Sequence, residues 1–231
     1  MTGEIVESRF AVSEGEAEVS AIWMHPPGAC RLLVLGHGAG AGMRHAFLQT
    51  LAETLAARGI ATFRYQFPYM ERGTGRPDPP LVLMATVASA VRAAAAAGPG
   101  LPILAGGKSM GGRMTSMTAA RGNLPEGVGG LVFFGFPLHQ AGKPSSARGE
   151  HLAGVRQPML FLQGTRDALA DLGLLRPICE RLGTRASLHV VEGADHSFHV
   201  LKRSGRSDSE VMDELVDAVS CWSSERPEGA A

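Results

Sequence analysis

The clearest chemical signal in the sequence surrounds one serine. A Gly-x-Ser-x-Gly pattern spans residues 107–111 and lies between a predicted strand and a predicted helix. Its glycines permit a turn so tight that side chains two residues from the serine would clash, and the turn lifts the hydroxyl out of the sheet. It also directs the Met110 amide, at a helix N-terminus, toward a negative oxygen that forms beside the serine. The pattern therefore predicts a nucleophile at Ser109.

A serine hydroxyl is a weak nucleophile and needs a base, and two later loops supply the partners. Asp167 follows a predicted strand at 159–162, and His196 follows the last predicted strand at 188–191. In this arrangement His196 accepts the Ser109 proton, and Asp167 holds the imidazole in the correct tautomer. We therefore expect Ser109, Asp167 and His196 to form a catalytic triad.

Other carboxylates and imidazoles are weaker candidates for these roles. We expect Asp171 to face solvent within the following helix, and Asp195 is too close to His196 in the chain to turn back onto it. His37 is expected to bond the backbone of its own loop, whereas His139 either lines a pocket or lies on the surface. The remaining rival histidines are His151, His189 and His199.

A second group of backbone donors is expected after an early strand. Residues 36–42 read Gly-His-Gly-Ala-Gly-Ala-Gly and follow a predicted strand at 32–35. Such a loop can bring a backbone N–H, which we place at Ala39, close to that of Met110. The two amides of Ala39 and Met110 are predicted to bind the substrate oxyanion.

Two segments of the sequence partly match nucleotide-binding motifs. Residues 36–41 fit Gly-x-Gly-x-x-Ala, but the next strand ends in Arg64 and Gln66 instead of the acidic residue of a dinucleotide site. Gly107-Lys108-Ser109 resembles the end of a P-loop, but Pro102 stands where that motif needs glycine. Neither reading accounts for Asp167 and His196.

The rest of the chain alternates short apolar runs with helical patterns, which predicts a mostly parallel sheet with helices on both faces. The apolar runs lack polar alternation, as in strands buried on both sides. Two long loops, 67–80 and 137–158, are candidates for function. About sixteen N-terminal and about eight C-terminal residues are expected to be frayed. The predicted strands are 18–24, 32–35, 61–66, 103–105, 131–134, 159–162 and 188–191, and the predicted helices are 45–58, 81–97, 110–121, 169–182 and 209–222.

Length and composition indicate the domain number, the partners and the location of the protein. The 231 residues favour one domain, 1–231, and 45% hydrophobic content excludes a disordered chain. Equal numbers of basic and acidic residues, 22 each, give no support to nucleic-acid or anionic-membrane binding. We expect three reduced cysteines, a cytoplasmic location, a small-molecule acyl substrate, and neither metal nor cofactor; the oligomeric state stays open.

Five segments together resemble a known family. They are 37–42, 67–70 (Phe-Pro-Tyr-Met), 107–113 (Gly-Lys-Ser-Met-Gly-Gly-Arg), 136–139 (Phe-Pro-Leu-His) and 195–198 (Asp-His-Ser-Phe). The chain is similar to small α/β hydrolases related to dienelactone hydrolase, in a group that also resembles a testis-expressed mammalian homologue. The resemblance covers residues 18–222 and implies an α/β-hydrolase fold with a mostly parallel seven- or eight-stranded sheet and no cap domain.

The resemblance and the triad together predict a serine hydrolase that cleaves a carboxylic ester or related acyl bond. Dienelactone hydrolase has a cysteine nucleophile, so Ser109 departs from its reaction. The same triad would also serve an acyltransferase, a perhydrolase or a peptidase, and the fold alone would serve a non-catalytic binding protein.

Overall fold

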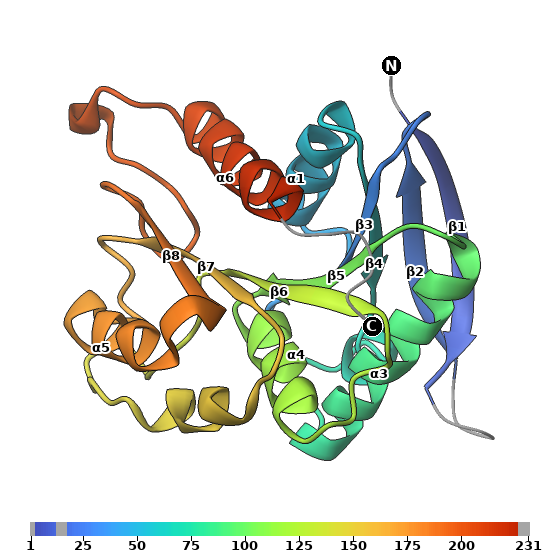
Figure 1. Cartoon of the computed structure of the whole chain (residues 1–231), viewed down its shortest axis with the longest axis horizontal. Coiled ribbons are helices and arrows are strands. Elements are labelled where there is room, and N and C mark those ends of the chain that lie inside the picture. Colours follow the sequence, from blue (N-terminus) through green and yellow to red (C-terminus); the bar gives the residue numbers. More distant parts are fainter. Residues whose placement is uncertain (1–2, 13–17, 226–231) are drawn as a thin grey trace.

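The computed structural model describes residues 3–12 and 18–225 and is organised around an eight-stranded sheet (Figure 1). Its order is β1-β2-β4-β3-β5-β6-β7-β8, with β2 antiparallel to both neighbours and the other pairs parallel. This confirms the predicted mostly parallel sheet. The strands are β1 (Glu4–Ala11), β2 (Glu18–His25), β3 (Arg31–Gly36), β4 (Ile60–Tyr65), β5 (Ile103–Lys108), β6 (Val128–Phe134), β7 (Met159–Gly164) and β8 (Ala186–Val191).

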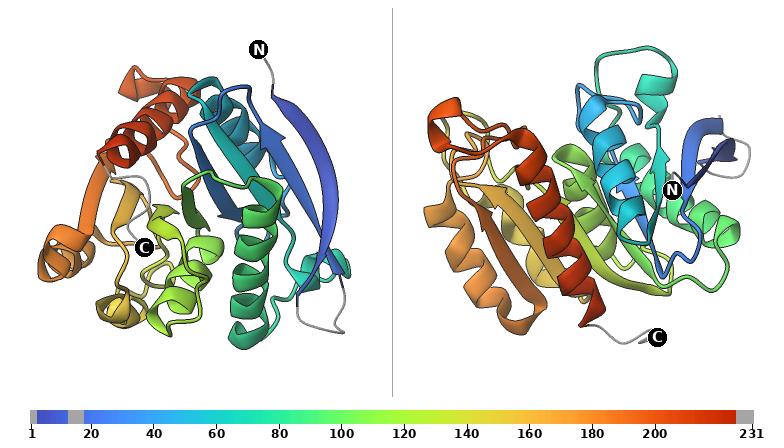
Figure 2. Two further views of the ribbon diagram at one scale, coloured as in Figure 1. Left: turned by 45° about the vertical axis from the view of Figure 1, so that its right-hand side comes forward. Right: turned by 90° about the horizontal axis from the view of Figure 1, so that it is seen from above.

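Helices cover both faces of the sheet (Figures 1 and 2). One face carries α1 (Ala46–Ala57) and α6 (Asp208–Ser224), which lie side by side. The other carries α3 (Pro80–Ala97), α4 (Met110–Ala120), α5 (Leu172–Leu182) and the 3₁₀ segment η1 (Ala147–Gly154). Successive β3 residues alternate between the two cores, because Leu32 and Val34 pack on the α3–α4 side and Leu33 and Leu35 on the α1–α6 side. The unbroken apolar run of this strand follows from that double burial.

The long loops carry only short helical segments. The loop at 67–80 holds α2 (Pro68–Glu71), and the loop at 137–158 holds η1. Two further 3₁₀ turns, η2 (Gly183–Arg185) and η3 (Lys202–Ser204), lie near β8 and before α6. In the described residues nothing covers the carboxyl edge of the sheet as a cap domain would, which agrees with the prediction.

The prediction of a frayed N-terminus is wrong for Glu4–Ala11. These residues form β1, paired with β2 along its whole length. Most of the strand is exposed, and charged or polar residues interrupt its apolar ones, so it lacks the unbroken apolar run of the inner strands. Arg9 anchors it through an ion pair of 2.9 Å to Glu71 in α2. Residues 1–2 and 13–17, also part of that expectation, lie outside the described residues.

The helix predicted at 169–182 begins later, at Leu172. Asp171 is the exposed N-cap of α5, and its carboxylate accepts the Gly173 N–H at 2.7 Å. The interpretation of Asp171 as a residue within the helix is therefore wrong, although its exposure is confirmed. An aspartate in this place satisfies an amide that the helix cannot.

Helix α3 is long and apolar enough, by length and composition alone, to cross a membrane. Half of that stretch is buried in the structure, with Val87, Ala90 and Val91 in the core against the sheet and α4. The burial of α3 against the sheet and α4 therefore accounts for its apolar composition.

The C-terminal end of α6 is fixed by Trp222. The ring is 6% exposed and lies over Gly130 of β6, where an added Cβ would meet it at 2.7 Å. Its Nε1–H donates to Ser187 Oγ at 3.1 Å. Ser223 is buried and Ser224 ends the helix, so the expected C-terminal fraying is wrong for both; residues 226–231 lie outside the described residues.

Replacing Trp222 by alanine is expected to lower the free energy of unfolding by about 3–5 kcal/mol, because it empties a buried site between α6 and the sheet. Urea denaturation measures the change. Ser187→Ala is the matched control, which keeps the ring and removes its hydrogen-bond acceptor, at a cost of about 1 kcal/mol. Equal losses in the two variants would contradict the packing role.

Candidate active site

Ser109 lies on a strained turn between β5 and α4. Its φ of 51° and ψ of −114° are unusual for a residue with a side chain. The turn is held against β3, because a Cβ at Gly111 would lie 2.3 Å from the Gly36 carbonyl oxygen. Only glycine permits that approach, and this is the local reason for the pattern at 107–111.

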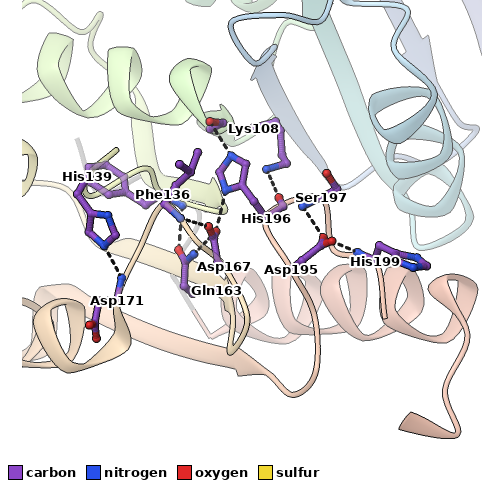
Figure 3. Close-up of polar contacts among 12 residues, drawn as sticks. Lys108, Phe136, His139, Gln163, Asp167, Asp171, Asp195, His196, Ser197 and His199 are labelled. Atoms are coloured by element: carbon purple, nitrogen blue, oxygen red, sulfur yellow. Dashed lines mark hydrogen bonds and ion pairs between the residues drawn. The ribbon is translucent and has the colours of Figure 1, made fainter. Parts of the chain in front are cut away.

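The structure brings the three predicted triad residues together. Figure 3 shows the His196 ring beside the Asp167 carboxylate. His196 Nε2 lies 2.9 Å from Ser109 Oγ, and His196 Nδ1 lies 2.7 Å from Asp167 Oδ2. The Asp167 side chain is fully buried, whereas the His196 side chain is 25% exposed. The acid is therefore shielded from solvent while the imidazole remains open to substrate.

The Asp167 carboxylate is surrounded by donors. Oδ1 accepts the Leu169 N–H at 2.7 Å, and Oδ2 accepts from the Gln163 side-chain amide as well as from His196. Gln163 is itself fixed, since its Oε1 accepts the Phe136 N–H at 2.9 Å. These bonds hold the oxygen that receives Nδ1–H, and Nε2 is then the nitrogen free to take the serine proton.

The predicted oxyanion loop is held by its own histidine. His37 Nδ1–H donates to the Gly38 carbonyl at 2.8 Å, and the Ala41 N–H donates to the same oxygen at 3.1 Å. A trans peptide directs its N–H opposite to its carbonyl, so these bonds also fix the Ala39 N–H. The structural role expected for His37 is confirmed by these contacts.

The two predicted oxyanion donors flank the serine. Ala39 lies with Ser109 in the wall of one cavity, and its carbonyl accepts the Tyr69 hydroxyl at 2.6 Å. Met110 supplies the first amide of α4. Within the described residues neither amide nitrogen donates to a protein acceptor. Both N–H groups are thus free for an oxygen of the substrate.

Lys108 lies next to the serine turn. Adjacent side chains on such a turn point apart, so the sequence predicts that Lys108 is structural or lies at a pocket edge, and the structure places it in the lining of the cavity beside Ser109. The structure directs Nζ to the His196 main-chain carbonyl at 2.5 Å, near the rings of Phe47 and Phe198. Burial lowers its pKa to about 8, and Asp167 opposes that shift. Lys108 thereby joins the end of β5, next to Ser109, to the loop that carries His196.

The predicted catalytic cavity, beside Ser109, has a volume of about 360 Å³. Residues 38–41 form one wall, and Phe47 and Leu48 of α1 form another. Ser109, His196 and Ser197 lie on the remaining side. This volume is in the range of sites for small organic molecules.

The rival residues lie elsewhere. Asp195 accepts backbone N–H groups of its own loop, and His199 is exposed and paired with Asp208. His189 pairs with Glu214, and His151 bonds Ser116. None of them contacts the Ser109 hydroxyl.

His139 fits neither reading of the sequence. It is buried, donates Nδ1–H to the Gln140 carbonyl at 2.9 Å, and accepts the Asp171 N–H on Nε2 at 2.8 Å. It joins the loop after β6 to the start of α5, and both expectations, pocket lining and surface, are wrong. Sequence reasoning also missed Gln163 and Gly135, whose positions beside the triad follow from contacts distant in sequence.

Comparison with known proteins agrees with this architecture. Residues 29–224 match the family described as "Alpha/beta hydrolase domain". The chain belongs to the alpha/beta hydrolase family. Three solved structures are similar to this α/β hydrolase over nearly the whole chain.

Dienelactone hydrolase from Anabaena variabilis ATCC 29413 is 21% identical, with a TM-score of 0.72 over 96% of this chain and 98% of that chain. An α/β serine hydrolase homologue from Coxiella burnetii is 21% identical, with a TM-score of 0.72 and coverage of 94% and 98%. A serine hydrolase without a lid from Xanthomonas campestris is 19% identical, with a TM-score of 0.71 and 95% coverage of both. At these identities the similarity shows the fold, which confirms the predicted α/β-hydrolase fold.

Gly135→Ala is expected to lower kcat about 10- to 100-fold. Gly135 has a φ of +68°, and an added Cβ would lie 3.0 Å from Lys108 Nζ, 3.4 Å from His196 Nδ1 and 3.5 Å from Asp167 Oδ2. The methyl group crowds the Lys108 ammonium, contacts the His196–Asp167 pair and strains a backbone of positive φ, so it perturbs the alignment of the three groups. Steady-state kinetics with an ester measures the effect. Gly122→Ala is the control, since its φ is +71° and no heavy atom lies within 4 Å of the added Cβ. Equal activity in both variants would contradict the steric argument.

The stability of this α/β hydrolase is expected to fall as the pH falls from about 6.5 to 4. Burial lowers the pKa of His37 to about 4, and its Nε2 accepts the Phe67 N–H at 3.1 Å. Between these pH values His37 is protonated in the unfolded chain but stays neutral in the folded one. Acid therefore lowers the free energy of unfolding by up to about 3 kcal/mol. Urea unfolding at pH 7 and pH 4.5 tests this. His37→Gln should reduce the pH dependence, and an unchanged dependence would refute the assignment.

Proposed function

We propose that this α/β hydrolase is a serine hydrolase that cleaves a carboxylic ester or a related acyl bond. The observation that carries the proposal is the relay from Ser109 Oγ through both His196 nitrogens to Asp167, with distances of 2.9 and 2.7 Å. A nucleophile, a base and an orienting acid in hydrogen-bond contact form the arrangement that acyl transfer to serine requires.

The reaction follows from these positions. Ser109 Oγ attacks the carbonyl carbon while its proton passes to His196 Nε2, and the carbonyl π electrons become an oxyanion bound by the Ala39 and Met110 amides. The oxyanion collapses, the bond to the leaving group breaks, and His196 gives its proton to that group. Water then attacks the Ser109 acyl ester by the same route, which releases the acid and restores the serine hydroxyl.

The open carboxyl edge favours hydrolysis over transfer to another acceptor. No cap covers the site within the described residues, and the His196 side chain keeps 25% exposure. Water therefore has access to the acyl-enzyme, and a small cavity accommodates short or flexible esters more readily than long chains buried whole. The similar structures described as dienelactone hydrolase and as serine hydrolases support this class of reaction.

The proposal also includes the domain organisation, cellular location and partners of this enzyme. Residues 1–231 form one domain, of the dienelactone-hydrolase-related group that resembles a testis-expressed mammalian homologue. The enzyme acts in the cytoplasm on a small-molecule acyl substrate, without nucleic-acid or membrane partners. Cys30, Cys179 and Cys221 are all free thiols, which supports a reducing compartment.

Ser109→Ala should lower kcat/KM for p-nitrophenyl acetate by about 10³-fold or more, because only binding and oxyanion stabilisation remain. Product absorbance measures the rate. Ser116→Ala is the matched control, since Ser116 Oγ lies 2.8 Å from His151 Nε2 in a second Ser–His pair outside the site. Wild-type activity in Ser109→Ala, or equal losses in both variants, would sink the proposal.

A further inference from the structure

A second hollow adjoins the catalytic cavity. It has a volume of about 320 Å³ and lies between α1 and α6, the two helices that run side by side over one face of the sheet (Figure 1). The two hollows share Phe47 and Ser197, so the second one, the α1–α6 groove, begins beside the residue that follows His196. The two hollows therefore meet at Phe47 and Ser197.

The groove is mostly apolar near the catalytic cavity. The rings of Phe47 and Phe198 stack at 5.7 Å, with an interplanar angle of 15°, and both line it. Val211, Met212 and Leu215 lie on the α6 side; all three are buried, and Met212 is the most accessible of them. The carboxylate in its lining, Asp208, is occupied with His199 at 2.9 Å. Such a surface binds hydrocarbon and has no free charge to attract an ionic group.

Phe198 occupies its place at a conformational cost. Its φ is +64°, and besides Ser109 it is the one non-glycine residue with positive φ in the described part of the chain. Backbone strain of this kind persists where surrounding structure imposes it, often at functional sites. The strained residue presents its ring to the groove two positions after the catalytic base.

We propose that the α1–α6 groove binds the alcohol portion of the ester substrate when that portion carries an unbranched apolar chain. This inference rests on the proposed function. His196 must donate its proton to the leaving oxygen at hydrogen-bond distance, so the leaving alcohol lies on the His196 side of the carbonyl. The groove opens on that side, at Ser197, and the acyl chain extends elsewhere. The substrate class is thus an ester of a straight-chain, apolar alcohol.

Two exposed positions allow the groove to be filled without changing the core. Thr50 in α1 and Ser209 in α6 line it from opposite sides. Thr50→Trp and Ser209→Trp each place an indole in the hollow, and either one suffices if the other fails to fold. Ala57→Trp adds the same group at the exposed far end of α1 and is the matched control.

The experiment compares two ester series on the purified full chain by acid release. The first series contains acetates of ethanol, butanol and hexanol, which all form the same acetyl-enzyme, so their differences report acylation alone. The second contains ethyl esters of acetic, butyric and hexanoic acids. In the wild type kcat/KM should rise with alcohol length by up to about fourfold per methylene. Both groove variants should reduce that rise to less than twofold per methylene and leave the acyl series unchanged. The control Ala57→Trp should match the wild type in both series.

Three results would overturn the assignment. The first is a wild-type kcat/KM that does not change with alcohol length. The second is a rise with alcohol length that persists in the folded groove variants. The third is that these variants change the dependence of kcat/KM on acyl length and not on alcohol length. Hydrolysis that requires Ser109 but shows no dependence on alcohol length would refute the groove and leave the proposed function standing. A wild type that cleaves none of the esters would refute both.

Discussion

The site depends on how closely the β5–α4 turn approaches the backbone of β3. A Cβ at Gly111 would stand 2.3 Å from the Gly36 oxygen, so only a bare backbone allows this packing. The approach holds Ser109 in its strained conformation beside the loop that starts at His37. Nucleophile and oxyanion loop are thus placed by one contact between main chains, which does not vary with side-chain rotamers.

The other catalytic loops reach the serine because parallel strands end at the same edge. Asp167 follows β7 and His196 follows β8. Hydrogen-bond donors then hold each of the two loops in place. Gln163 and the Leu169 amide hold the carboxylate, while the Lys108 ammonium holds the His196 carbonyl. Ser109 and His196 are therefore coupled twice, through the imidazole and through the side chain next to the serine. This is the preorganisation that electrostatic stabilisation of a transition state requires.

The sequence was informative wherever a local pattern decides the structure. The inner strands were predictable because burial on both faces leaves an unbroken apolar run, and the serine turn because its glycines and flanking elements restrict the backbone. The same logic missed β1, because this exposed edge strand mixes charged and apolar residues and has no unbroken apolar run. His139 was ambiguous because its partners, Gln140 and the Asp171 amide, include one 32 residues away. Gln163, Gly135 and the α1–α6 groove were invisible for that reason, since packing between distant segments creates them.

The central claim is that Ser109 is a base-activated nucleophile, and covalent labelling tests it without knowledge of the natural substrate. The folded protein would be treated with a fluorophosphonate, its intact mass measured, and the modified peptide sequenced. The arrangement predicts one adduct per chain, on Ser109, absent from Ser109→Ala and strongly slowed in Asp167→Asn. A folded wild type that stays unmodified, or an adduct on another residue such as Ser116, would contradict the account.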